Sequence, residues 1–105
     1  MKPVRLHSAA QAEIIEAVAF YNDARDGLGD AFADEVEAAL GRIGRQPKAH
    51  SLYRDGYRKC KLSKRFPYVI FYYEYDDHVW VASVYHGHRE PDTWMDRAPG
   101  NGDAT

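Results

Sequence analysis

One stretch of the sequence, from Phe66 to Tyr75, constrains the fold more than any other part of the chain. It reads FPYVIFYYEY, so nearly every position is aromatic or β-branched. Such residues favour strands, and a strand that is apolar on both faces is usually central in its sheet. Asp76-Asp77 then predicts a tight turn, and residues 78–86 return as a partner strand through three valines. The C-terminal half is therefore expected to form an antiparallel sheet around residues 66–75.

The start of the chain predicts a short strand followed by a helix. Val4 and Leu6 alternate with polar residues, as in a strand that is buried on one side. We expect the helix to run from about Ala9 to Arg25, with Ser8 as its N-cap and Gln11 completing a capping box. Apolar residues at helical spacing are expected to face the core, and these are Ile14, Ile15, Val18 and Tyr21.

A second helix is expected directly after the first. Residues 26–29 read DGLG and break the helical pattern, after which Asp30 can serve as an N-cap. Gln46-Pro47 then ends the second helix, because proline disfavours a helical residue before it. The helix carries a single apolar stripe, made of Phe32, Val36, Leu40 and Ile43. Because the break is short, we expect the two helices to form an antiparallel hairpin.

Charge is divided unevenly along the chain. Residues 8–45 contain eight acids and three bases, a net charge of −5, whereas residues 53–65 contain six bases and one acid, a net charge of +5. The basic block includes an expected strand, residues 57–62. Alternation puts Arg58, Cys60 and Leu62 on one face of this strand and Tyr57, Lys59 and Lys61 on the other. Such a block forms either a site for an acidic partner or an ordinary solvated surface.

Together these elements predict an α+β fold with the order β-α-α-β-β-β. The helical hairpin is expected to pack on one face of a small, mostly antiparallel sheet, formed by the C-terminal strands and the first strand. The other sheet face is expected to stay partly open, bordered by residues 57–62 and 86–97. We expect a single domain over residues 1–97, with one helical turn near Pro91–Met95. Residues 98–105 are small and polar and are expected to be a disordered tail.

Several classes of protein are excluded at this stage. The only cysteine, Cys60, rules out a disulfide framework and a cysteine-based zinc site. The sequence contains no apolar run long enough to span a membrane, and residues 1–7 do not resemble a signal peptide, so we expect a cytoplasmic protein. His86 and His88 have no third ligand at a plausible spacing, so neither a metal nor another cofactor is expected.

The order of elements and several short stretches resemble the RelE/ParE toxin superfamily. The similarity covers residues 2–97 and includes Arg58, Tyr72 and the Phe66-Pro67-Tyr68 stretch. It is carried further by the ending Val84-Tyr85-His86-Gly87-His88-Arg89-Glu90-Pro91-Asp92-Thr93-Trp94. The resemblance implies the toxin of a bacterial type II toxin–antitoxin pair, which a cognate antitoxin holds inactive.

The superfamily contains two activities, and the resemblance leaves both open. ParE-like members inhibit DNA gyrase by binding it, whereas RelE-like members cleave messenger RNA on the ribosome. RelE-like nucleases carry a Tyr-Arg pair on the central strand, but here the pair is Tyr68-Val69, which favours gyrase inhibition. If the protein were a ribonuclease, its phosphate contacts and proton transfer would come from Arg58, Lys59, Lys61 and His86. A member that only binds a partner, without toxicity, is the third alternative.

The basic block also predicts where the antitoxin binds. An acidic or amphipathic segment would be attracted to the sheet face that carries Lys59 and Lys61. Arg89 and Trp94 are the further candidates near the end of the chain, as a cation and an aromatic ring that could grip a partner, or as structural residues. The expected partner-binding residues are Lys59, Lys61, Lys64, Arg65, Arg89 and Trp94.

Overall fold

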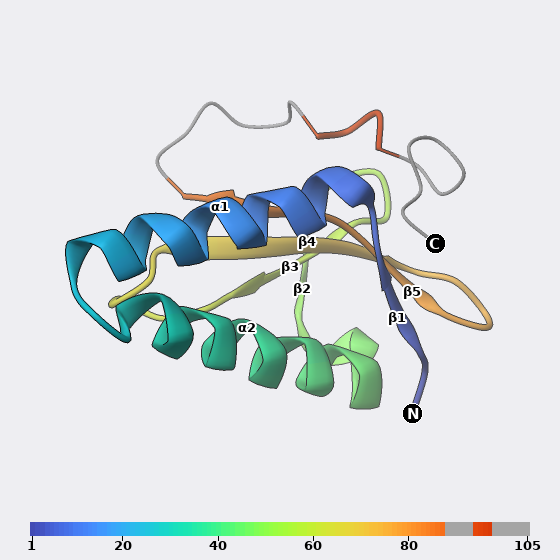
Figure 1. The fold of residues 1–105 in the computed structure, drawn as a ribbon. Coiled ribbons are helices and arrows are strands. Elements are labelled where there is room, and N and C mark those ends of the chain that lie inside the picture. Colours follow the sequence, from blue (N-terminus) through green and yellow to red (C-terminus); the bar gives the residue numbers. More distant parts are fainter. Residues whose placement is uncertain (88–93, 98–105) are drawn as a thin grey trace.

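A computed structural model describes residues 1–87 and 94–97, and Figure 1 shows its arrangement. The elements are β1 (Val4–Leu6), α1 (Ser8–Ala24), α2 (Leu28–Arg45), a short 3-10 helix η1 (Pro47–Ala49), β2 (Ser51–Leu52), β3 (Arg58–Lys61), β4 (Tyr68–Glu74) and β5 (Val79–His86). The predicted α+β order is confirmed, with η1 and β2 as additions. His88, Arg89, most of the expected turn at Pro91–Met95 and the expected tail at 98–105 lie outside the described residues.

All five strands form one sheet in the order β1-β5-β4-β3-β2. β1 runs parallel to β5, and the remaining neighbours are antiparallel. β4 lies at the centre, as its aromatic sequence predicted, and most of its residues are buried. The β4–β5 register shifts between Phe71 and Tyr72: Phe71 pairs with Ser83 and Tyr72 with Val81, so Ala82 is the extra residue of a bulge in β5. The short strand β2 covers only the first part of the outer edge of β3.

Both helices pack on the same face of the sheet, as Figure 1 shows. The predicted stripe of α2 faces this core, because Phe32, Val36 and Ile43 are buried and Leu40 is half-buried. Ile14, Val18 and Tyr21 of α1 pack against the same cluster. The expectation for Ile15 is wrong, since its side chain is 69% exposed. Ile14 already faces the core at this level of α1, so its neighbour points outward.

The helix caps differ from those that the sequence predicted. His7, rather than Ser8, is the N-cap of α1, and its Nδ1 accepts a hydrogen bond of 2.9 Å from the Ala9 amide. Gly27, rather than Asp30, is the N-cap of α2, in a left-handed conformation with φ of 81°. Because glycine supplies no side-chain cap, Asn22 of α1 does so across the hairpin: its Oδ1 accepts from the Gly29 amide at 2.7 Å.

The second sheet face is covered by an aromatic cluster and is not open in the way the sequence suggested. Phe71, Ala82 and Tyr85 of the sheet pack here with Tyr57 and Trp94. The Trp94 ring is fully buried. Arg97 then ties this end of the chain to α1, because its guanidinium donates to Glu13 Oε2 at 3.0 Å. Glu13 Oε1 accepts in turn from the Val84 amide, beyond the part of β5 that pairs with β1.

Candidate partner-binding surface

Four of the predicted partner-binding residues gather around β3 and the turn that follows it. Lys59 is half-buried, and Lys61, Lys64 and Arg65 are exposed. Lys59 lies opposite Phe71, and Lys61 opposite Val69, both on β4. Because Phe71 and Val69 belong to the aromatic cluster, the two lysines lie on the face away from the helices. We call the residues Lys59, Lys61, Lys64 and Arg65 the basic surface.

Two residues that the sequence analysis did not select extend the basic surface. The Tyr53 ring is half-buried on the aromatic cluster, 5.1 Å from the Phe71 ring. The Lys59 ammonium lies 5.6 Å from the centre of the Tyr53 ring, and the Arg54 guanidinium lies 5.4 Å from it. These are cation–π distances. The position of Tyr53 could not be read from the sequence, because it follows a strand of only two residues that carries no alternating pattern.

Arg58 belongs to the opposite face, as the predicted alternation of β3 required. Its guanidinium donates to the carbonyl oxygen of His50 at 2.7 Å and to that of Lys48 at 3.4 Å. Burial, with the positive charges of Arg42 and Arg58, lowers the pKa of His50. Arg58 therefore holds the chain between η1 and β2 in place. Its side chain lies on the face of β3 opposite to that of Lys59 and Lys61.

His86 is the last residue of β5 and lies away from both the basic surface and Arg58. It pairs with Tyr68 of β4, and the two rings meet edge to face at 5.1 Å. It also lines a hollow on the α1 side of the sheet, together with Glu13 and Glu16. The four residues assigned to a ribonuclease thus do not converge: Lys59 and Lys61 share a face, while Arg58 and His86 lie elsewhere.

Val69 is the residue that the resemblance to the superfamily matches to an arginine of the nuclease branch. Its side chain is half-buried against the aromatic cluster, between Lys61 on β3 and Tyr85 on β5. Valine offers neither a charge nor a hydrogen bond at this point. Among the described residues, the cations nearest Val69 on β3 are Lys61 and Lys59, which are flexible point charges without the planar fork of arginine.

The two remaining partner-binding candidates have different outcomes. Trp94 is fully buried and stacks on Phe71 with 4.4 Å between ring centroids. In this position the Trp94 side chain is part of the apolar core of the second sheet face and is not accessible to a partner. Arg89 lies outside the described residues.

Burial raises the pKa values of the thiol of Cys60 and of the hydroxyl of Tyr72, which both lie in the core on the helix side of the sheet. The Cys60 thiol therefore stays protonated and unreactive near neutral pH. The pKa of Tyr72 rises to about 12, and its hydroxyl donates to the Pro47 carbonyl at 2.6 Å. Residues 1–87 and 94–97 contain no cluster of three metal-ligating side chains and no helix long and apolar enough to cross a membrane.

Comparison with known proteins gives two matches to this architecture. Residues 4–91 match the family model of the ParE toxin of the type II toxin–antitoxin system, parDE. The fold is also similar to a solved structure of the chromosomal ParDE toxin–antitoxin system from P. aeruginosa. That match has a TM-score of 0.71 and 11% sequence identity, and it covers 82% of this chain and 96% of the other. No curated protein sequence matches the chain.

Proposed function

The chain belongs to the ParE toxin family of type II toxin–antitoxin systems, and we propose that it poisons DNA gyrase by binding it rather than by cleaving RNA. ParE toxins typically act on gyrase. The observation that carries the proposal is the separation of the groups that a nuclease would need. Cleavage requires a base, an acid and preorganised cations around one phosphate. Here Arg58 and His86 lie apart from the two lysines, and Val69 replaces the phosphate-binding arginine.

The experiment compares the two targets with the same purified toxin. The toxin is separated from its partner under denaturing conditions, refolded and added to a gyrase supercoiling assay. It is added in parallel to ribosomes programmed with a defined messenger RNA. We expect inhibition of supercoiling and no cleavage in the ribosomal A site. Cleavage that is abolished by His86→Ala or Lys61→Ala, with supercoiling unaffected, would establish the ribonuclease alternative instead.

We further propose that a ParD-type antitoxin neutralises the toxin and that one of its acidic segments covers the basic surface. Lys59 and Lys61 lie on one face of β3 there, and the Tyr53 ring contacts Lys59 and one further cation, Arg54. A surface of one sign attracts a segment of the opposite sign and speeds association with it. We propose that the protein acts in the cytoplasm, because both proposed partners, an antitoxin and gyrase, are cytoplasmic proteins.

A further inference from the structure

A second group of basic side chains lies on the helix side of the sheet, opposite to the basic surface. Arg42 is in the last turn of α2, His50 follows η1, and Arg58 is the first residue of β3. Burial, and then the charges of Arg42 and Arg58, lower the pKa of His50. Both guanidinium groups therefore lie within electrostatic range of the imidazole. We call Arg42, His50 and Arg58 the α2–β3 cluster.

The α2–β3 cluster has no carboxylate partner among the described residues. The ion pairs of residues 1–87 and 94–97 include neither of its arginines. Residues 38–54 contain no acid, and the only acid of β4, Glu74, is already bound by Lys2 and Lys48. Positive charges that are gathered without a counterion repel one another in the folded state. Such a cluster is a candidate binding site for an anion.

Two local features account for the arginines, but neither accounts for the state of the histidine. The C-terminal end of α2 favours a cation such as Arg42, and Arg58 donates to the carbonyl oxygens of Lys48 and His50. If these contacts neutralised both guanidinium groups, the two arginines would not lower the pKa of His50. The positive potential at the imidazole is therefore not offset by the groups that surround it.

The donors of the α2–β3 cluster are of the kind that binds phosphate. Both hydrogen bonds of Arg58 come from Nη1, so its Nε and Nη2 have no partner among the described residues. Arg42 is exposed, and His50 and Arg58 are half-buried, so an anion from solution can reach all three. A planar guanidinium matches a pair of phosphate or carboxylate oxygens. Two such groups match the charge of a phosphate monoester better than that of a carboxylate or a phosphodiester, which each carry one charge.

We propose that the α2–β3 cluster binds a doubly charged oxyanion, of which a phosphate monoester is the biological example. Arg42 and Arg58 supply the charge, and His50 is the third donor. The site lies on the face of β3 opposite to Lys59 and Lys61, so it goes beyond the proposed function and does not depend on it. A bound anion offsets the two positive charges and is therefore expected to raise the pKa of His50.

Of the groups around His50, only the imidazole changes its charge between about pH 5 and pH 8. The Tyr72 ring of β4 meets the His50 ring edge to face at 6.2 Å, and its pKa is raised to about 12. The pKa of the Cys60 thiol on β3 is also raised, so both groups stay neutral. The groups that keep their charge over this range are Arg42 on α2, Lys48 on η1, Arg58 on β3 and Glu74 on β4.

The test titrates the full toxin chain with sodium sulfate, which is doubly charged over this whole range, at constant ionic strength. NMR of the imidazole signals follows the binding, and His50→Gln assigns the signal of His50. We expect saturable binding, a raised pKa of His50, and a lower Kd at about pH 5.5 than at about pH 7.5. In His50→Gln this dependence on pH should be lost, while sulfate still binds.

Arg42→Gln removes one of the two charged ligands at an exposed position, so circular dichroism is expected to show an unchanged fold. Its Kd for sulfate should rise about tenfold, as for the loss of one charged hydrogen bond. Lys59→Gln is the matched control, because it removes the same charge from the other face of β3. An equal loss of affinity in both variants, or no saturation in the wild type, would overturn the site.

Methyl phosphate and dimethyl phosphate distinguish the class of ligand. At about pH 7.5 the monoester carries close to two charges and the diester one, so we expect the monoester to bind about tenfold more tightly. Equal Kd values would overturn the monoester assignment and point to the backbone of a nucleic acid as the ligand. The gyrase assay of the proposed function is independent of these titrations, so failure of one does not decide the other.

Discussion

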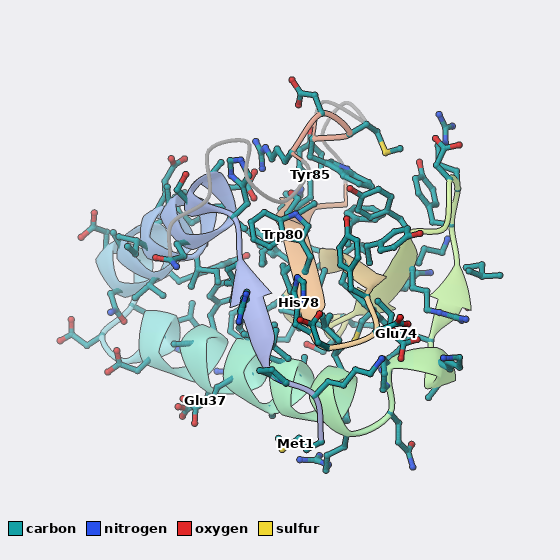
Figure 2. The ribbon with its side chains drawn as sticks, turned by 90° about the vertical axis from the view of Figure 1, so that its right-hand side faces the viewer. Met1, Glu37, Glu74, His78, Trp80 and Tyr85 are labelled. Carbon is teal, nitrogen blue, oxygen red and sulfur yellow. The ribbon has the colours of Figure 1, made fainter. Side chains whose placement is uncertain are left out.

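Trp94 stacks on Phe71 across the sheet face that the helices leave uncovered, with ring planes inclined by only 22°. Trp94 also meets Tyr57 edge to face at 5.0 Å. Three residues later, Arg97 binds Glu13 of α1 and accepts a hydrogen bond of 2.7 Å from Trp80 Nε1 at its carbonyl oxygen. The end of the described chain thus completes the second apolar layer, as Figure 2 shows around Trp80 and Tyr85.

The first prediction concerns this layer. Trp94→Ala removes a fully buried ring and is expected to lower the free energy of unfolding by about 3–5 kcal/mol. Trp94→Phe should cost clearly less, because stacking on Phe71 is kept and the indole N–H has no hydrogen-bond partner among the described residues. Urea unfolding, followed by circular dichroism, measures both values. Equal costs for the two variants would show that stacking on Phe71 does not stabilise the fold.

The second prediction concerns the apolar stripe of α2. Ile43 is fully buried, so Ile43→Ala should cost about 2–5 kcal/mol in unfolding free energy. Leu40 is half-buried and lines an open hollow with Val4 and Leu6, so Leu40→Ala should cost only about 1–2 kcal/mol. Chemical denaturation of both variants tests the difference. A larger loss for Leu40→Ala than for Ile43→Ala would contradict the observed orientation of α2.

The sequence predicted the elements whose signal is repeated over many residues. The aromatic run placed β4 at the centre, and the four-residue stripe gave the buried face of α2. It could not predict η1 and β2, because two or three residues hold no periodicity. For Ile15, the sequence left open which of two adjacent isoleucines on α1 faces the core. The structure shows that Ile14 packs against the core and that Ile15 is exposed.

The third prediction concerns the contact between the two helices at Gly29. A Cβ atom there would lie 2.1 Å from the Val18 carbonyl oxygen and 2.6 Å from Asn22 Cγ. Since the first of these atoms belongs to the α1 backbone, Gly29→Ala should force the helices apart and destabilise the protein by about 1–3 kcal/mol. Gly41→Ala is the control, because a Cβ there meets only the end of the Arg45 side chain at 3.3 Å. We expect this control to be neutral or stabilising by about 0.5–1 kcal/mol.

The fourth prediction concerns the dependence of stability on pH. Glu74, which Figure 2 labels, binds Lys2 at 2.7 Å and Lys48 at 2.8 Å. Hydrogen bonds from Lys2, and then from Lys48, lower the pKa of Glu74. A carboxylate with a lowered folded pKa stabilises the fold above its unfolded pKa, near 4.3, and loses this contribution as pH falls through the folded value.

Wild type and Glu74→Gln should therefore differ in thermal stability by a constant amount from pH 7 to about pH 5, and the difference should shrink below about pH 4. Thermal melts over this range measure it. Lys48→Gln, which removes the more exposed of the two lysines, should reduce the difference without abolishing it. A difference that stays constant down to pH 3 would mean that the ion pairs do not contribute.

The candidate site was less predictable than the fold, for reasons that particular residues illustrate. Alternation along β3 correctly separated Lys59 and Lys61 from Arg58, because it is a property of any strand. The role of Arg58 depends on carbonyl groups that precede it by eight and ten residues, and no local pattern records that contact. Trp94 was open to two interpretations, because only the tertiary fold brings it onto Phe71.

The last prediction tests the basic surface. Lys59→Gln and Lys61→Gln together remove two cations from the face that we assign to an acidic segment of the antitoxin. The double variant should weaken the complex and flatten the dependence of its Kd on salt, because fewer ion contacts remain to be screened. Arg5→Gln and Arg45→Gln form the control: they change the net charge equally, but both residues are exposed on β1 and α2, away from β3. If both double variants shift the salt dependence alike, overall charge and not this surface attracts the antitoxin.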